Sequence, residues 1–312
     1  MTEYVTLSQN HMNTTFHFKV PFENGTDRRR LESLLIDAHA EVARLETLWS
    51  EFIASSEIAL LNVTEVGAWM AVSHETSDVL KMGLEIGSQT DDAFSLCAKS
   101  SSIEARTSGL ELDTKNLRAR RLVPDAHLGL GAIGKGAALD RVAVFLERQG
   151  VEAAFLSAGG SSLLGWGRPE RGRSWTFQWK VLGKVLEGVR GVGMETRELT
   201  ITDGSRMGVG ISGTDEQGAH IIEKSTSPHT SRRGEKRGAG NGTSPRTLSS
   251  MVGHPLAAKA DALSTARFLA PLSRQFADLP QAFLEESADS EDRAEPLRLS
   301  WNSAFEEAFL RG

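Results

Sequence analysis

Residues 129–136 hold the densest group of residues suited to binding a small anionic molecule. The range contains four glycines and Lys135 at a predicted helix start, where free amide N–H groups favour an anion. A lysine there adds a point charge suited to phosphate. A second small-residue turn follows at Ser157–Ser162, and its glycines let a ligand approach the backbone because no Cβ stands in the way. The segment therefore indicates a helix–strand unit with ligand-facing turns at both ends.

The rest of the chain supplies elements that would hold these turns in place. Apolar residues alternate over 11–21, which predicts a half-buried strand. From Leu31 to Trp49 they recur with helical spacing, after a capping Thr26 or Asp27. Ser55–Asn62 is predicted as a short turn. Other predicted elements are a helix at 73–87, strands at Trp175–Leu182 and Gly208–Gly213, and a helix at Ala257–Leu269.

Two stretches near the C-terminus differ in character from the rest. Residues 224–250 show no hydrophobic period and are rich in Ser, Gly and basic residues, so we expect a long surface loop inserted in the domain. Three roles are open for this loop: a lid over a phosphate-bearing substrate, a surface that recruits an acidic partner, or a disordered insertion. Residues 273–312 are predicted as an acidic segment followed by a docking helix that carries Trp301, Phe305 and Phe309.

The gross composition excludes several classes of protein. A formal charge of −6 gives no overall attraction to nucleic acid. With one cysteine, Cys97, the chain forms no internal disulfide and no cysteine-based zinc site. No apolar run is long enough for a transmembrane helix, and the N-terminus has no secretory signal pattern. A cytoplasmic location is therefore expected.

Six separated segments together resemble the ApbE-like FAD:protein FMN transferases. Members of this family attach FMN from FAD to a threonine of a partner protein. The resemblance covers about residues 12–272, and it implies an α+β fold of mixed, largely antiparallel sheets flanked by helices. The segments are Met12–Phe16, Ser56–Asn62, Gly129–Gly136, Ser157–Gly160, His220–Glu223 and Ala260–Thr265.

The resemblance also implies a magnesium site. Asp261 and Thr265 match the side chains that hold Mg²⁺ in the family, together with the backbone carbonyl of Ala158. These are the hard oxygen donors that Mg²⁺ prefers, and a spacing of four places the two side chains on one helix face. The alternative for this pair is a helix cap followed by a buried threonine.

Other positions match the family's flavin site. His220 matches a histidine linked to activation of the acceptor hydroxyl; its alternative is a packed histidine beside a strand. Lys135 matches the lysine of the glycine-rich turn. The remaining candidates for contact with FAD are Met12, Phe52, Ala93, Phe94, Gly131, Ala158, Gly159, Gly160 and Thr226, and ordinary core packing is the alternative for Met12, Phe52, Ala93 and Phe94.

The chain departs from the family pattern at several of these turns. Gly129, Ser95 and Ser161 stand where members commonly carry aspartate, and Phe52 stands where tyrosine is more usual. Each missing carboxylate removes a polar anchor worth about 1–3 kcal/mol.

Our leading hypothesis is Mg²⁺-dependent transfer of FMN from FAD to a protein threonine, with release of AMP and with His220 taking the threonine proton. One alternative is a catalytically impaired homologue that binds a flavin nucleotide or acts as a scaffold. Another is a pyrophosphatase that splits FAD into FMN and AMP. The predicted partners are FAD and a flavin-accepting protein.

Overall fold

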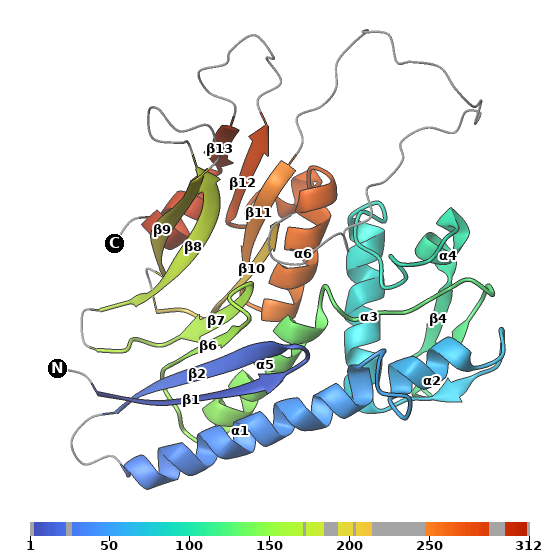
Figure 1. Cartoon of the computed structure of the whole chain (residues 1–312), viewed down its shortest axis with the longest axis horizontal. Coiled ribbons are helices and arrows are strands. Elements are labelled where there is room, and N and C mark those ends of the chain that lie inside the picture. Colours follow the sequence, from blue (N-terminus) through green and yellow to red (C-terminus); the bar gives the residue numbers. More distant parts are fainter. Residues whose placement is uncertain are drawn as a thin grey trace, which may run out of the picture.

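An antiparallel sheet of eight strands forms the centre of the protein, for which we describe a computed structural model (Figure 1). The structure describes residues 3–22, 27–170, 173–183, 193–201, 204–213, 247–286 and 297–310. The strands lie in the order β1 (Glu3–His11), β2 (Thr14–Phe22), β6 (Ala154–Ala158), β7 (Ser162–Trp166), β10 (Met207–Gly213), β11 (Thr247–His254), β12 (Gln281–Glu286) and β13 (Leu297–Trp301).

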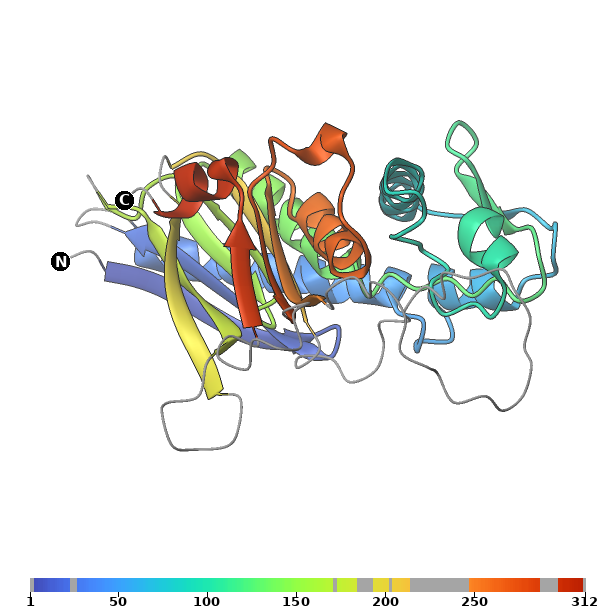
Figure 2. The same cartoon turned by 90° about the horizontal axis from the view of Figure 1, so that it is seen from above.

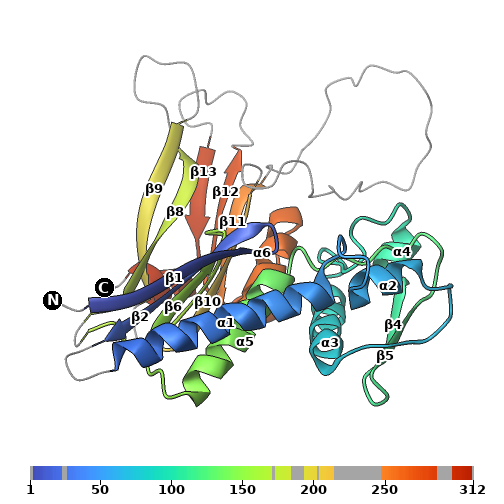
Figure 3. The ribbon, with the colours of Figure 1, turned by 60° about the horizontal axis from the view of Figure 1, so that its bottom comes forward.

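Helices cover one face of this sheet and a hairpin covers the other (Figure 3). The helices are α1 (Arg28–Trp49), α5 (Gly134–Arg148) and α6 (Ala257–Leu269), and their apolar faces join the strands in one large core. On the other face, β8 (Trp175–Gly183) pairs with β9 (Gly193–Ile201). A second core between that hairpin and the sheet includes Trp179, Phe305 and Phe309. Phe305 lies in α7 (Ser303–Phe305), and Phe309 lies in the short π-helix η2 (Glu306–Leu310) that follows it.

A smaller lobe lies at the far end of α1 (Figure 2). It contains α2 (Glu57–Val63), α3 (His74–Gln89), α4 (Ile103–Ser108) and a three-stranded sheet in the order β3 (Met70–Ala71), β5 (Arg118–Arg121), β4 (Leu110–Asp113). Arg121 is buried in this lobe and donates hydrogen bonds to the carbonyls of Leu61, Thr64, Pro124 and Ala126. A single side chain therefore ties β5 to the end of α2 and to the loop that follows β5.

The predicted fold class is confirmed, since every described strand pair is antiparallel and helices flank the sheet. The helix capped by Asp27 and the helix at Ala257–Leu269 are present as predicted. No described helix combines the length and the apolar character needed to cross a membrane.

Three expectations need correction or extension. Ser56 caps a helix, α2, where a turn was predicted, because its side chain accepts a hydrogen bond from the amide of Ala59. Thr247–Ser250, placed in the basic loop by composition, form the start of β11, where Ser249 and Ser250 are buried. β12 and β13, which belong to the segment predicted from residue 273 on, continue the main sheet. Trp301, which the sequence places in the docking helix, is the last residue of β13, whereas Phe305 and Phe309 lie in the helical turns after it and pack in the second core.

Candidate functional site

Helices α5 and α6 begin side by side, and each is capped by an aspartate of the other. Neither helix has a side-chain cap of its own. Asp140 of α5 accepts hydrogen bonds from the amides of Ala257 and Ala258 at 3.0 and 2.9 Å. Asp261 of α6 accepts one from the amide of Gly136 at 2.8 Å through Oδ2. This exchange satisfies amides that a helix start otherwise leaves unpaired, and it fixes the Asp261 carboxylate at the start of α5.

Two glycines allow this close packing. A Cβ at Gly136 would collide with the backbone of Ala257, and one at Gly210 of β10 would lie 2.6 Å from the amide nitrogen of Asp261. Backbone cannot move aside as a flexible side chain can, so only glycine lets α6 lie this near to α5 and β10. The glycine-rich segment thus positions Asp261 as well as facing a ligand.

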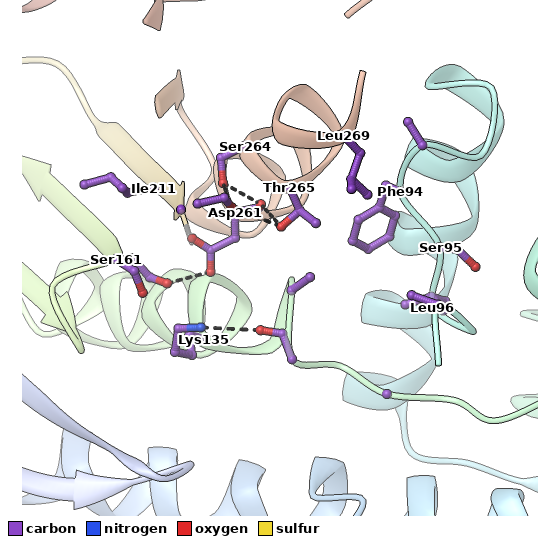
Figure 4. Close-up of a pocket in the computed structure, with 18 of the residues that line it drawn as sticks. Phe94, Ser95, Leu96, Lys135, Ser161, Ile211, Asp261, Ser264, Thr265 and Leu269 are labelled. Carbon is purple, nitrogen blue, oxygen red and sulfur yellow. Dashed lines mark hydrogen bonds between the residues drawn. The ribbon is translucent and has the colours of Figure 1, made fainter. Parts of the chain in front are cut away.

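The first of two adjoining hollows opens beside Asp261 (Figure 4). On one side lie the hydroxyl and carboxylate groups of α6 together with Lys135. Phe94 faces them from the loop that follows α3, and Ser95 and Leu96 of the same loop also line the hollow, with the Ser95 hydroxyl turned away from Asp261. Ala93, Lys99, Gly129, Gly131, Ala132, Ser161, Ser162, Ile211, Ser212 and Ser264 also line this first hollow.

Among the residues that the structure describes, Asp261 is the only carboxylate that lines the first hollow. Burial raises its pKa to about 7, although Lys135, the hydroxyl of Ser162 and the amide of Gly136 all favour the charged form. Ser162 donates to Oδ2 at 2.7 Å, so the same oxygen receives two hydrogen bonds. Oδ1 receives none from the described part of the chain and remains free for a ligand.

Three further hydroxyl groups, on Thr265, Ser264 and Ser212, form a cluster at Asp261, two of them through its backbone carbonyl. Thr265 Oγ1 donates to the carbonyl of Asp261 at 3.2 Å and lies 3.3 Å from Ser212 Oγ. Ser264 Oγ lies 2.9 Å from Ser212 Oγ. No group of three or more His, Cys, Asp or Glu side chains able to hold a metal occurs among the residues that the structure describes. One carboxylate with neutral oxygens fits a hard cation that also takes phosphate oxygens and water, as Mg²⁺ does.

Lys135 lies where the first hollow meets the second. Its ammonium donates to the carbonyl of Gly131 at 3.3 Å, and none of the salt bridges in the described ranges involves it. A cation that forms no salt bridge with a described carboxylate, at a junction lined by Gly131 and Ser161, is suited to an anionic ligand.

The second hollow lies between the β1–β2 turn and the end of α1. Met12 and Asn13 form that turn with φ values of 49° and 60°, which L-residues adopt only at a cost. Glu46 of α1 holds the turn by accepting a hydrogen bond from the amide of Met12 at 2.8 Å. Behind it, buried His11 and His39 stack, with His11 Nε2 3.3 Å from His39 Nδ1.

Phe52 lies at the mouth of the second hollow with 75% of its surface exposed. Beside it, Glu51 forms ion pairs with Lys99 and His127. Sequence reasoning missed Glu51, Lys99 and His127, because three residues so far apart in the chain carry no common spacing; only the fold brings them together.

The structure brings together most of the candidate residues. Asp261, Thr265, Ala93 and Phe94 line the first hollow, Met12, Phe52 and Gly159 line the second, and Gly131 and Lys135 line both. Gly160 follows Gly159 in the β6–β7 turn, where both have left-handed φ. Ala158 is fully buried in β6 and lines neither hollow. His220 and Thr226 lie outside the described residues.

The comparisons with known proteins agree with this architecture. The model of the ApbE family matches residues 12–102 and 98–283, so the chain belongs to the ApbE family. Among solved structures, the flavinyl transferase ApbE of Pseudomonas stutzeri, in its apo form, matches with a TM-score of 0.74 at 19% identity, over 100% of this chain and 98% of that one.

Two further structures show the same fold. The flavin transferase ApbE of Vibrio cholerae has a TM-score of 0.74 at 19% identity, covering 99% of this chain and 100% of its own. The ApbE protein of Thermotoga maritima has a TM-score of 0.70 at 18% identity, covering 98% of this chain and 99% of its own. No curated protein matches the sequence significantly.

Proposed function

We propose that this protein transfers the FMN part of FAD to a threonine of a partner protein and releases AMP, with Mg²⁺ as cofactor. Family membership supports a flavin transferase. The observation that carries the proposal is the continuity of the two hollows. The acidic and hydroxyl groups around Asp261 lie at one end, exposed Phe52 lies at the other, and Lys135 lies between them. This order matches a ligand whose charged phosphates lie next to a planar ring.

In this proposal, Asp261 through Oδ1 and Thr265 through its hydroxyl hold the metal. The carbonyl of Ala158, which is fully buried and lines neither hollow, stays the third proposed ligand by family resemblance. When bound, Mg²⁺ neutralises charge that develops on the leaving phosphate. Lys135 holds the phosphates by charge, and the Gly136 amide keeps the carboxylate of Asp261 in one orientation.

The reaction forms one bond and breaks one. The threonine oxygen attacks the phosphorus of the FMN part, the bond from that phosphorus to the bridging oxygen breaks, and AMP leaves with the bridging oxygen. The threonine proton passes to a general base. His220 is our candidate for this base by family resemblance.

The test is Asp261→Asn in an assay with FAD, Mg²⁺ and a flavin-accepting domain, read as covalent flavin fluorescence on the acceptor. We expect the rate to fall about a hundredfold or more because a neutral amide binds Mg²⁺ poorly. Asp78→Asn is the matched control, since the Asp78 side chain is 70% exposed and pairs only with Arg141 among the described residues. Mg²⁺-dependent transfer that survives in Asp261→Asn at the control's rate would contradict the proposal.

The same assay separates a second candidate, hydrolysis of FAD with water as the acceptor. Ser95, Gly129 and Ser161 all line the first hollow, and the hydroxyl of Ser95 donates a hydrogen bond to the carbonyl of Arg106 in α4. Without longer acidic side chains at these positions, the hollow has more room for water. Release of FMN and AMP in the absence of acceptor would favour hydrolysis. FAD binding with no product would favour a binding protein.

A further inference from the structure

Glu51 is a largely enclosed carboxylate in the second hollow, and three separate parts of the chain meet at it. It follows the end of α1, and its side chain is 13% exposed. Lys99, from the loop after α3, donates to Oε1 at 2.6 Å, and His127, from the segment before α5, lies 3.1 Å from Oε2. The carboxylate is thus fixed in direction by two partners on different segments.

The surroundings of Glu51 keep it ionised. Burial alone would raise its pKa, but the hydrogen bonds and positive charges of Lys99 and His127 outweigh burial, and the pKa lies below its ordinary value. An ionised carboxylate has about four acceptor positions. Lys99 and His127 occupy two of them, so acceptor capacity remains for a ligand.

Gly129 lies beside Glu51 and presents no side chain to it. A Cβ at Gly129 would lie 3.4 Å from Oε1 of Glu51, which is ordinary van der Waals contact. Gly129 therefore leaves open the space beside this oxygen, on the side that faces the first hollow.

An aromatic side chain stands next to the carboxylate. Phe52 is exposed, and the ammonium of Lys99 lies 5.6 Å from the centre of its ring. An exposed aromatic face binds a planar ring by stacking, and a fixed acceptor beside it can take a hydrogen bond from the edge of that ring. This pair of groups suits a heterocycle that carries an N–H donor.

We propose that Glu51 determines ligand specificity by accepting a hydrogen bond from an N–H group of a planar heterocycle stacked on Phe52. The inference rests on the proposed function, because FAD is the ligand expected in the two hollows. FAD contains two such heterocycles, the flavin ring and adenine. Both have an N–H edge, and the experiment distinguishes them.

The test compares binding of FMN and of AMP to the wild type and to Glu51→Gln by calorimetry. The variant loses a hydrogen bond to a charged acceptor. We therefore expect the affinity for one of the two ligands to fall about tenfold or more, and the affinity for the other to stay unchanged. Glu85→Gln is the matched control, since Glu85 is half exposed on α3, pairs weakly with Lys81 and lines neither hollow. It should bind both ligands like the wild type.

A second measurement guards against a merely structural effect of the substitution. Methylation of the ring N–H of FMN, or double methylation of the amino group of AMP, removes the donor from the ligand. The wild type should bind the affected ligand about tenfold more tightly than its methylated form, and Glu51→Gln should bind the two forms alike.

If Glu51→Gln binds FMN as tightly as the wild type does, and also binds AMP as tightly, the role of Glu51 is overturned. The proposed function then stays intact. The same holds if both proteins discriminate equally against the methylated forms. If the wild type binds neither FAD, FMN nor AMP, both the proposed function and this inference fail.

Discussion

The two hollows are built in different ways. The first is held by backbone, because α5, α6 and β10 touch through glycines and exchange caps through Asp140 and Asp261. The second is held by side chains, because Glu46 fixes the turn at Met12, and Lys99 and His127 fix Glu51. Backbone contacts tolerate almost no change of residue, whereas ion pairs between side chains can be replaced by other pairs.

This difference teaches where the chain can vary. The groups suited to a metal and to phosphate lie in the first hollow, where their positions depend on the packing of main chain. The groups suited to a ring lie in the second, where a change of a few side chains alters what is recognised. Such a division lets one fold keep its chemistry while its ring contacts change.

The sharpest way to break the first hollow is Gly210→Ala. The added Cβ would collide with the backbone at Ala260 and Asp261, so α6 must shift, and we expect a loss of about 3 kcal/mol in the free energy of unfolding. Chemical denaturation measures this loss. Gly131→Ala is the control, because its Cβ would meet nothing within 4 Å. Equal stability of the two variants would show that backbone contact does not set the position of α6.

A smaller effect is expected from Asp140→Ala. Asp140 accepts from the amides of Ala257 and Ala258 and pairs with Arg206 at 2.9 Å. Its removal leaves the start of α6 uncapped, and we expect a cost of about 2 kcal/mol. Denaturation of Asp140→Ala beside Asp78→Ala, which removes an exposed carboxylate, isolates the capping role. A loss no larger than that of the control would show that α6 needs no cap from α5.

The smallest effect concerns His39, which lies behind the Met12 turn of the second hollow, and it is a change of stability with pH. Burial lowers the pKa of His39 to about 4, whereas in the unfolded chain it lies near 6.5. Between these values the unfolded chain binds more protons, so the free energy of unfolding falls as pH drops from about 6.5 to about 4. We expect His39→Gln to lessen the fall in Tm between pH 7 and pH 5 by about 3 °C.

His254, whose pKa is also lowered to about 4 by burial, keeps its own contribution in that variant. The control is His74→Gln, on an exposed residue at the start of α3. Its Tm should change with pH as in the wild type. If His39→Gln shows the same change with pH as this control, then the histidines behind the Met12 turn are not the source of the acid sensitivity.

Local signals in the sequence predict a large part of the fold. Ala257–Leu269 and the helix capped by Asp27 follow from helical spacing and capping residues. The alternation does not predict β1, because only Val5 and His11 of its nine residues are buried, whereas its partner β2 carries the clearer alternation. The buried start of β11 was assigned to a loop because its serines lower the local hydropathy, although Ser250 donates to the carbonyl of Ser264 inside the core.

The same contrast holds for the site. Lys135, Asp261 and Thr265 stand in short motifs whose spacing is visible in the chain, and the structure brings them to one hollow. The fold alone brings together Glu51, Lys99 and His127, so no local sequence pattern predicts this cluster. Motifs therefore predict the hollow built by backbone better than the hollow built by side chains.

Because α5 and α6 cap each other, their N-terminal turns should unfold locally together. If Asp261 swings away, the amide of Gly136 loses its acceptor, and if Asp140 moves, those of Ala257 and Ala258 lose theirs. Neither helix can fray at its start without weakening the other, so the two share one opening equilibrium. A cation held by Oδ1 of Asp261 would lower the population of that open state, and would thereby protect backbone more than 100 residues away along the chain.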